Sequence, residues 1–160
     1  MSSLERYLAA NERFAADPFP QVSHLPSGQV AVVTCMDCRM HPEQFLGLEH
    51  GEAHVIRNAG GSAEDALRSL IVSQQLLGTR TVLVIKHTGC GMQNDVAAAL
   101  NSAAAEHGST LPHVDWHDFT DLEEAVRGDV SLLRDHPALV GTAVHGLIFD
   151  VADGTLRVVA

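Results

Sequence analysis

The 160-residue chain is poor in several features that define other classes of protein. Its three cysteines are an odd number, which does not suggest a disulfide framework and is typical of reduced thiols in a cytosol. Its apolar runs are shorter than the roughly 18 residues that a membrane-spanning helix requires. Residues 1–6 lack the basic start and the apolar stretch of a signal peptide. We therefore expect a cytoplasmic protein without a membrane partner.

Positive charge and aromatic side chains are also scarce. Ten Lys and Arg residues stand against 20 Asp and Glu residues, which gives a formal net charge of −10 at pH 7. An acidic body repels phosphate groups, so a nucleic acid is not an expected partner. Aromatic residues make up only 4% of the chain but hydrophobic residues 46%, so the core must be aliphatic. The length fits one core, and we expect a single domain over residues 1–160.

Strand-like and helix-like segments alternate along this domain. Residues 4–16 have the pattern of a helix that Asp17-Pro18 ends, and residues 1–20 form an arm that cannot bury itself and lies on the body or on a second subunit. The Asp153-Gly154 pair predicts a hairpin turn near the C-terminus. Strands are expected at residues 30–35, 53–57, 81–86, 142–151 and 155–159, and helices at residues 41–50, 63–77, 92–107 and 121–134.

This alternation indicates a fold class. Strands that are separated by helices pair in parallel through right-handed crossovers. We therefore predict an α/β protein, a three-layer α/β/α arrangement with a mostly parallel sheet and an antiparallel C-terminal edge strand. In open parallel sheets, ligands gather beyond the carboxyl ends of the strands. Side chains at those ends are therefore the first candidates for a site.

Three soft metal ligands lie at such strand ends. Cys35 ends the first expected strand, and His87 follows the apolar run of residues 81–86. Cys90 comes three residues later, after a tight turn that Gly89 allows. Zn²⁺ binds thiolate and imidazole readily, and a catalytic zinc keeps a position for water, whose pKa it lowers to about 7. The pattern predicts a zinc site that generates a nucleophile at neutral pH.

The third cysteine leaves two other interpretations open. Cys35-Met36-Asp37-Cys38 is a C-x-x-C motif, and Cys38 together with Cys35, His87 and Cys90 makes a Cys₃His set. Such a set forms closed structural zinc sites, which have no catalytic water. A redox pair of Cys35 and Cys38 is the other interpretation, although the helix that normally starts at the first thiol is lacking.

At these residues the chain resembles the β-class carbonic anhydrases, in particular the compact bacterial and archaeal branch. The matching segments are Cys35-x-Asp37-x-Arg39, Arg57-Asn58-Ala59-Gly60-Gly61 and His87-x-x-Cys90. The resemblance extends from about residue 30 to the strand at residues 146–150. It implies the parallel fold, a homodimer or larger homo-oligomer, and Cys35, His87 and Cys90 as zinc ligands. The residue between Asp37 and Arg39 is usually small in this family, and here it is Cys38.

The resemblance also implies a reaction, the zinc-dependent, reversible hydration of carbon dioxide to bicarbonate and a proton. In this family the aspartate, here Asp37, either pairs with the arginine, here Arg39, or moves to the metal as a fourth ligand. The backbone N–H groups of Gly60 and Gly61 precede a helix, which suits an anion such as bicarbonate, although a simple tight turn is an equal alternative. Two other functions remain open, a zinc hydrolase of carbon disulfide or carbonyl sulfide and a non-catalytic protein with a closed zinc site.

Overall fold

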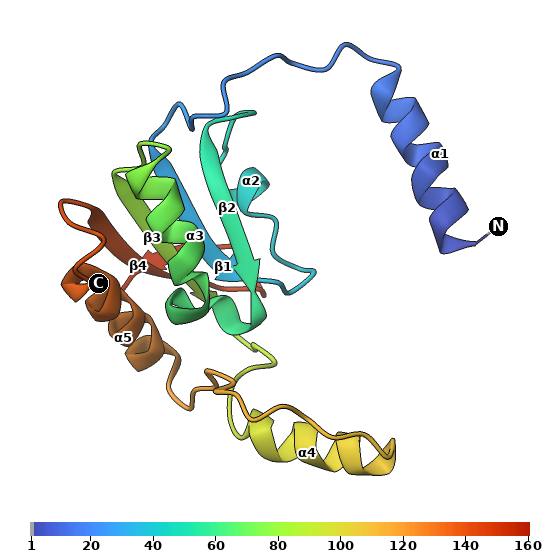
Figure 1. Ribbon diagram of the computed structural model, residues 1–160, viewed down its shortest axis with the longest axis vertical. Coiled ribbons are helices and arrows are strands. Elements are labelled where there is room, and N and C mark those ends of the chain that lie inside the picture. Colours follow the sequence, from blue (N-terminus) through green and yellow to red (C-terminus); the bar gives the residue numbers. More distant parts are fainter. Residues whose placement is uncertain (1) are drawn as a thin grey trace.

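A computed structural model describes residues 2–160, and in it five strands form one sheet between helices (Figure 1). The order of the strands is β2-β1-β3-β4-β5. The first four run parallel, and β5 pairs antiparallel with β4 after the predicted hairpin. The predicted fold class is therefore confirmed. The strands are β1 (Val30–Cys35), β2 (Ala53–Asn58), β3 (Thr81–His87), β4 (Ala143–Phe149) and β5 (Leu156–Val158).

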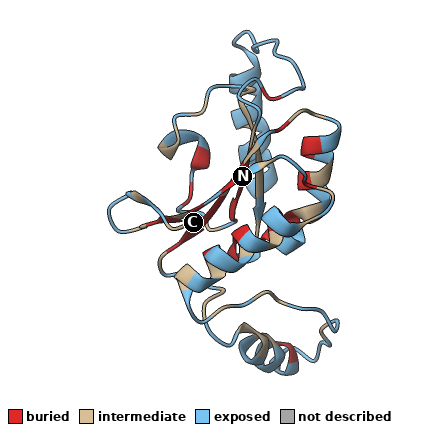
Figure 2. Ribbon diagram, turned by 90° about the vertical axis from the view of Figure 1, so that its left-hand side faces the viewer, coloured by how far each residue is buried: buried red, intermediate tan, exposed pale blue. Residues whose placement is uncertain are grey.

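Helices α3 and α5 cover one face of the sheet, against an aliphatic core that includes Leu70, Val84 and Leu133. The opposite face is covered by the segment around α2, where Phe45 stacks on Phe149 with 4.4 Å between ring centroids. Burial is concentrated in the strands between these layers (Figure 2). The helices are α1 (Ser3–Ala15), α2 (Pro42–Phe45), α3 (Ala63–Gln75), α4 (Val96–Glu106) and α5 (Leu122–Asp135).

The capping residues explain where the longer helices start. Ser62 precedes α3, and its side chain accepts a hydrogen bond from the Asp65 N–H group, as expected for an N-cap. Asp121 caps α5 in the same way. Two acidic residues in the first turn of each helix complement the positive end of its dipole.

Two helices are shorter than the sequence predicts. The helix expected over residues 41–50 is reduced to α2, since the chain takes a positive φ of 66° at Gly47. The helix expected from residue 92 begins only at Val96, because the Asn94 N–H group bonds to the Phe119 carbonyl at 2.7 Å and Asn94 has a φ of 72°. The bond between Asn94 and Phe119 joins segments that are distant in the sequence, so helical periodicity does not reveal it.

The helices α1 and α4 project from opposite ends of the body (Figure 1). No residue of Ser3–Ala15 is buried, and α4 buries only Ala104. The exposed side chains of α1 include Leu4, Tyr7 and Phe14. The helix α1 therefore shows apolar surface that the described chain does not cover. Within residues 2–160, helices of the length and apolar character that a bilayer crossing demands are absent.

Candidate metal centre

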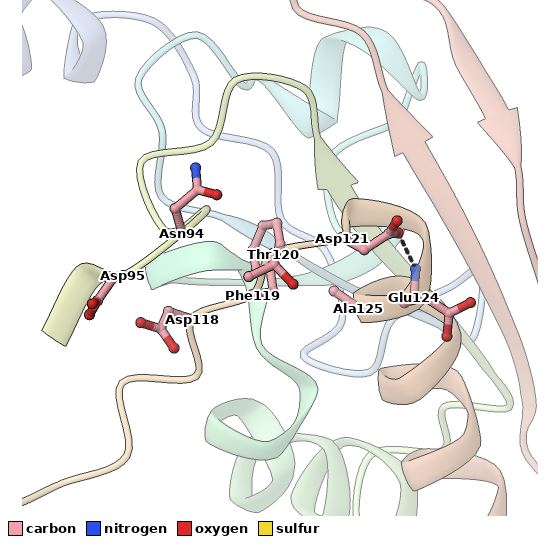
Figure 3. Close-up of a pocket in the computed structure, with 8 residues that line it drawn as sticks. All are labelled: Asn94, Asp95, Asp118, Phe119, Thr120, Asp121, Glu124 and Ala125. Carbon is pink, nitrogen blue, oxygen red and sulfur yellow. Dashed lines mark hydrogen bonds between the residues drawn. The ribbon is translucent and has the colours of Figure 1, made fainter.

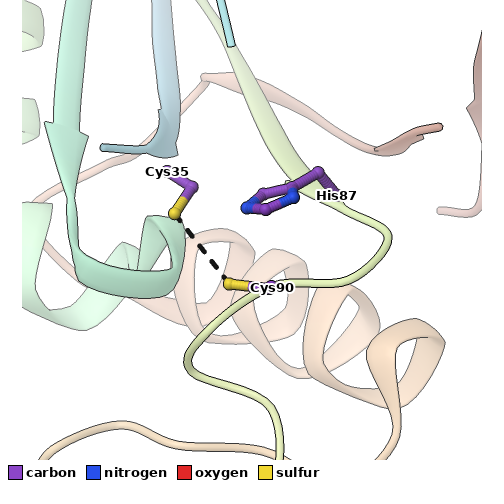
Figure 4. A group of neighbouring side chains, drawn as sticks. All are labelled: Cys35, His87 and Cys90. Atoms are coloured by element: carbon purple, nitrogen blue, oxygen red, sulfur yellow. Dashed lines mark hydrogen bonds between the residues drawn. The ribbon is translucent and has the colours of Figure 1, made fainter. Parts of the chain in front are cut away.

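The three predicted soft ligands meet at the carboxyl end of the sheet (Figure 4). β1 and β3 are adjacent and parallel, so Cys35 and His87 end side by side, and the turn after β3 returns Cys90 to them. Their ligand atoms all lie within 4.8 Å of one another, and the two Sγ atoms are 3.9 Å apart. All three residues are buried. Cys38 is exposed and is not a member of this cluster, so the Cys₃His set does not come together here.

The imidazole of His87 is oriented for a metal. Its Nδ1 atom lies 2.9 Å from the Thr88 carbonyl oxygen, so this nitrogen carries the proton and donates it to the carbonyl. The lone pair of Nε2 then faces the cluster. This Nε2 atom is buried and has no hydrogen-bond partner among residues 2–160. A buried polar atom without a partner is rare, and a bound cation accounts for it.

The two thiols are also suited to binding a cation. A hydrogen bond from the Cys90 thiol lowers the pKa of Cys35 to about 4, although burial acts in the opposite direction, and N–H groups of Asp37 and Gly60 contribute further. The pKa of Cys90 is raised, because it donates to that thiolate and because it is buried. The second thiol thus resists ionisation next to the first. A divalent soft cation removes this conflict by binding both thiolates, so the residues present fit zinc.

Asp37 and Arg39 form an ion pair beside the cluster. The Arg39 Nε atom and one terminal nitrogen reach the two carboxylate oxygens of Asp37 at 2.9 and 2.7 Å. Hydrogen bonds from the Arg39 side chain and from its backbone N–H hold the pKa of Asp37 well below its usual range. The Asp37 Oδ2 atom lies 3.8 Å from His87 Nε2. The carboxylate is therefore an ionised hydrogen-bond acceptor next to the point where the three ligands converge.

Two arginines fix the loops that carry the cysteines. Arg39 also donates to the carbonyl of Gly89 at 3.0 Å, which joins the loop of Asp37 to the turn before Cys90. Arg57, on β2, donates to the carbonyls of Cys35 and Asp37 at 3.0 and 2.7 Å. Sequence reasoning noted Arg57 only as part of a matching segment. Its role depends on strand pairing, since β2 lies next to β1.

The glycine turn between β2 and α3 lies against the same cluster. Gly60 and Gly61 have φ values of 71° and 62°, and a Cβ atom on Gly61 would lie 3.0 Å from the backbone nitrogen of Cys35. The carbonyls of both glycines accept hydrogen bonds from Lys86, and the Gly60 N–H group favours the Cys35 thiolate. These contacts support the tight-turn interpretation, and bicarbonate binding by the two glycines stays a prediction.

A separate hollow of about 600 Å³ opens where the segment after Cys90 meets the start of α5 (Figure 3). Four carboxylates lie on its wall, and one of them, Asp121, is engaged in capping α5. None of the three cluster residues lines it. An acidic wall does not suit an anionic product, so we do not place the reaction there. The lining residues are Asn94, Asp95, Asp118, Phe119, Thr120, Asp121, Glu124 and Ala125.

Comparisons with known proteins place the whole chain in one family. The family model described as carbonic anhydrase matches residues 30–127. Beta-carbonic anhydrase 1 of Mycobacterium tuberculosis is 36% identical over 98% of each chain. The crystal structure of a carbonic anhydrase from Streptococcus mutans superposes with a TM-score of 0.91 at 36% identity, covering 100% of this chain and 99% of that one. A carbon disulfide hydrolase of Acidianus is 31% identical over 79% of this chain and 74% of its own. The chain belongs to the β-carbonic anhydrase family.

Proposed function

We propose that the protein catalyses the zinc-dependent, reversible hydration of carbon dioxide to bicarbonate and a proton. The observation that carries the proposal is the buried group of Cys35, His87 and Cys90, in which an unpartnered imidazole nitrogen faces two crowded sulfur atoms. These three residues would hold the ion. When it is bound, zinc supplies a Lewis acid that ionises water near neutral pH. Membership of the β-carbonic anhydrase family supports carbon dioxide as the substrate.

Asp37 is proposed to orient the reacting water. Its carboxylate stays ionised because Arg39 binds both of its oxygens, so it accepts a hydrogen bond and does not donate one. A water that donates one proton to Asp37 presents a lone pair away from the carboxylate, toward the substrate. This fixed geometry lowers the entropic cost of orienting the water for the reaction. Without Arg39, the same carboxylate is an anionic oxygen ligand next to a cation, which is the proposed closed state.

The proposal includes an assembly and a compartment. The exposed apolar residues of α1 support a second copy of the chain as their cover, in a homodimer or a larger homo-oligomer. Two substitutions on α1, Leu8→Glu and Phe14→Glu, should then shift the sedimentation coefficient toward that of the monomer, whereas Glu12→Gln on the same helix should not. The three free cysteines support a reducing cytoplasm, since the two cluster thiols must stay unpaired to bind metal.

Stopped-flow measurement of carbon dioxide hydration tests the reaction. The zinc-loaded protein should accelerate hydration, a strong chelator should abolish the acceleration, and added zinc should restore it. Turnover that is absent from about pH 6 to 9, a range around the pKa of zinc-bound water, would refute the proposal. The similarity to the Acidianus carbon disulfide hydrolase favours one second candidate. The same samples are therefore given carbon disulfide, and release of hydrogen sulfide without carbon dioxide hydration would favour that activity.

A further inference from the structure

A buried positive charge lies directly behind the candidate metal centre, and the reaction proposed above does not use it. Lys86 precedes His87 on β3, and its side chain is only 4% exposed. Successive residues of a strand point to opposite faces, so the ammonium group of Lys86 leaves the sheet on the side of α3 and α5. Nζ makes three hydrogen bonds there, to Asp129 Oδ2 at 2.9 Å and to the carbonyls of Gly60 and Gly61 at 3.1 and 3.3 Å.

Asp129 connects this ammonium group to two helices. It belongs to α5, and its Oδ2 atom also accepts the N–H group of Ala63 at the start of α3 at 3.1 Å. All three protons of Lys86 thus have acceptors, and the arrangement joins β3, α5 and the glycine turn. A buried ion pair of this kind is weak evidence for stability, because apolar side chains of similar volume often stabilise a fold as well. The cost of burying Lys86 therefore calls for another explanation.

The glycine turn that Lys86 holds is in contact with a metal ligand. Gly61 packs against the backbone of Cys35 so closely that a side chain would not fit, since a Cβ atom there would lie 3.0 Å from the Cys35 nitrogen. The positive charge of Lys86 also favours the thiolate of Cys90. Lys86 therefore influences both cysteines. It acts on Cys35 through the glycine turn and on Cys90 through its positive charge.

We propose that Lys86 is a positioning residue of the metal centre, which holds the Gly60–Gly61 turn against the backbone of Cys35 and so fixes the position of the Cys35 sulfur. Asp129 fixes the ammonium group in place for this purpose. The nearby charge of Lys86 also lowers the electrostatic cost of two thiolates whose sulfur atoms are 3.9 Å apart. The inference rests on the metal centre of the proposed function but not on the carbon dioxide reaction.

Cobalt(II) substitution tests the proposal, because cobalt reports on its thiolate ligands spectroscopically. Co²⁺ affinity is measured by competition with a chelating dye, together with the thiolate-to-cobalt charge-transfer absorption. Lys86→Met, which keeps the length of the side chain but has no proton donor, should lower the affinity by about tenfold, as loss of an outer-sphere contact does. The charge-transfer band should move away from its wild-type wavelength, since the Cys35 sulfur changes its position at the bound cobalt when the turn is released.

Val84→Ala is the matched control. Val84 lies on the same face of β3 two residues earlier, is fully buried, and belongs to the hydrophobic core. Its truncation should lower the melting temperature but leave the charge-transfer band where it is in the wild type. An unmoved band in Lys86→Met, or an equal shift in Val84→Ala, would overturn the proposal.

Two further variants keep the test decisive if Lys86→Met does not fold. Lys86→Gln retains a donor for the glycine carbonyls without the charge, and Asp129→Asn retains Lys86 but removes its counter-ion. Each should also move the band away from its wild-type wavelength, by a smaller amount than Lys86→Met, and a wild-type spectrum in both would also overturn the proposal. A wild-type protein that binds Co²⁺ but does not hydrate carbon dioxide when loaded with zinc refutes only the proposed function. A wild-type protein that does not bind Co²⁺ refutes the positioning role as well.

Discussion

Two ion pairs flank the three ligands, and they differ in burial and in the number of elements that they join. Arg39 and Asp37 are two residues apart on one loop, and their side chains are 49% and 17% exposed. Lys86 and Asp129 come from β3 and α5, and Lys86 is almost completely enclosed. The first pair is local and accessible to water. The second is part of the packing between the sheet and its helices.

This difference suggests that the two ion pairs have different roles at the same site. A pair that is accessible to water exchanges partners at a lower cost than a buried pair, which suits a carboxylate that is proposed to change between arginine and metal. A buried pair is costly to break, because one charge is left without compensation. The accessible pair is therefore suited to the reaction, and the enclosed pair to holding the site in shape. The predictions that follow test this division, from the largest expected effect to the smallest.

Breaking the enclosed pair should cost the most. Asp129→Ala leaves the Lys86 ammonium group buried without its counter-ion and should lower the free energy of unfolding by about 3 kcal/mol. Urea denaturation measures the change. The control is Glu123→Ala, which removes exposed pairs with Arg127 and Arg157 and should have only a slight effect. Equal losses in the two variants would contradict the distinction between the pairs.

Removing the carboxylate of the accessible pair should affect turnover and not folding. Asp37→Ala is expected to lower kcat for carbon dioxide hydration by about 100-fold, the lower range for loss of a positioned proton acceptor. Zinc content, measured by atomic absorption after dialysis, should stay at the wild-type level, because Asp37 is outside the ligand cluster. Wild-type turnover in this variant would show that Asp37 has no part in the reaction.

The contribution of Arg39 to the stability of the fold should depend on pH. Arg39 lowers the pKa of Asp37, so the pair stabilises the fold above the ordinary aspartate pKa of about 3.9, and this contribution is lost as the pH falls through and below that value. Arg39→Ala should therefore have a lower melting temperature than the wild type at pH values above 4, and the two curves should converge in more acidic solution. Thermal melts at a series of pH values check this. A gap that widens on acidification would have the wrong sign.

The smallest effect is expected at Cys38. It is exposed and outside the ligand cluster, although it lies between Asp37 and Arg39 in the sequence. Cys38→Ser should leave zinc affinity and turnover unchanged, because a serine occupies the same space. Competition with a chelating dye measures the affinity. A large loss of zinc in this variant would support the closed Cys₃His interpretation instead.

The sequence predicts the parts of this protein that depend on local pattern. The strand-ending positions of Cys35 and His87 follow from two apolar runs, and the cap at Ser62 from its place before a helical segment. What the sequence does not reveal depends on contacts across the fold. In the sequence, Lys86 is only a charged residue within an apolar strand. No sequence pattern identifies Asp129 as its partner.

The fork of Arg39 holds Asp37 and at the same time grips the Gly89 carbonyl on the opposite loop. In the proposed closed state, in which the carboxylate has left Arg39, the guanidinium can therefore keep its hydrogen bond to the Gly89 carbonyl. When Asp37 leaves the metal again, the guanidinium is already in position to bind it, so the ion pair can form again without a rearrangement of Arg39. The reversibility of the proposed change therefore depends on Arg39 and on its hydrogen bond to a main-chain oxygen, which a substitution of Gly89 would not remove.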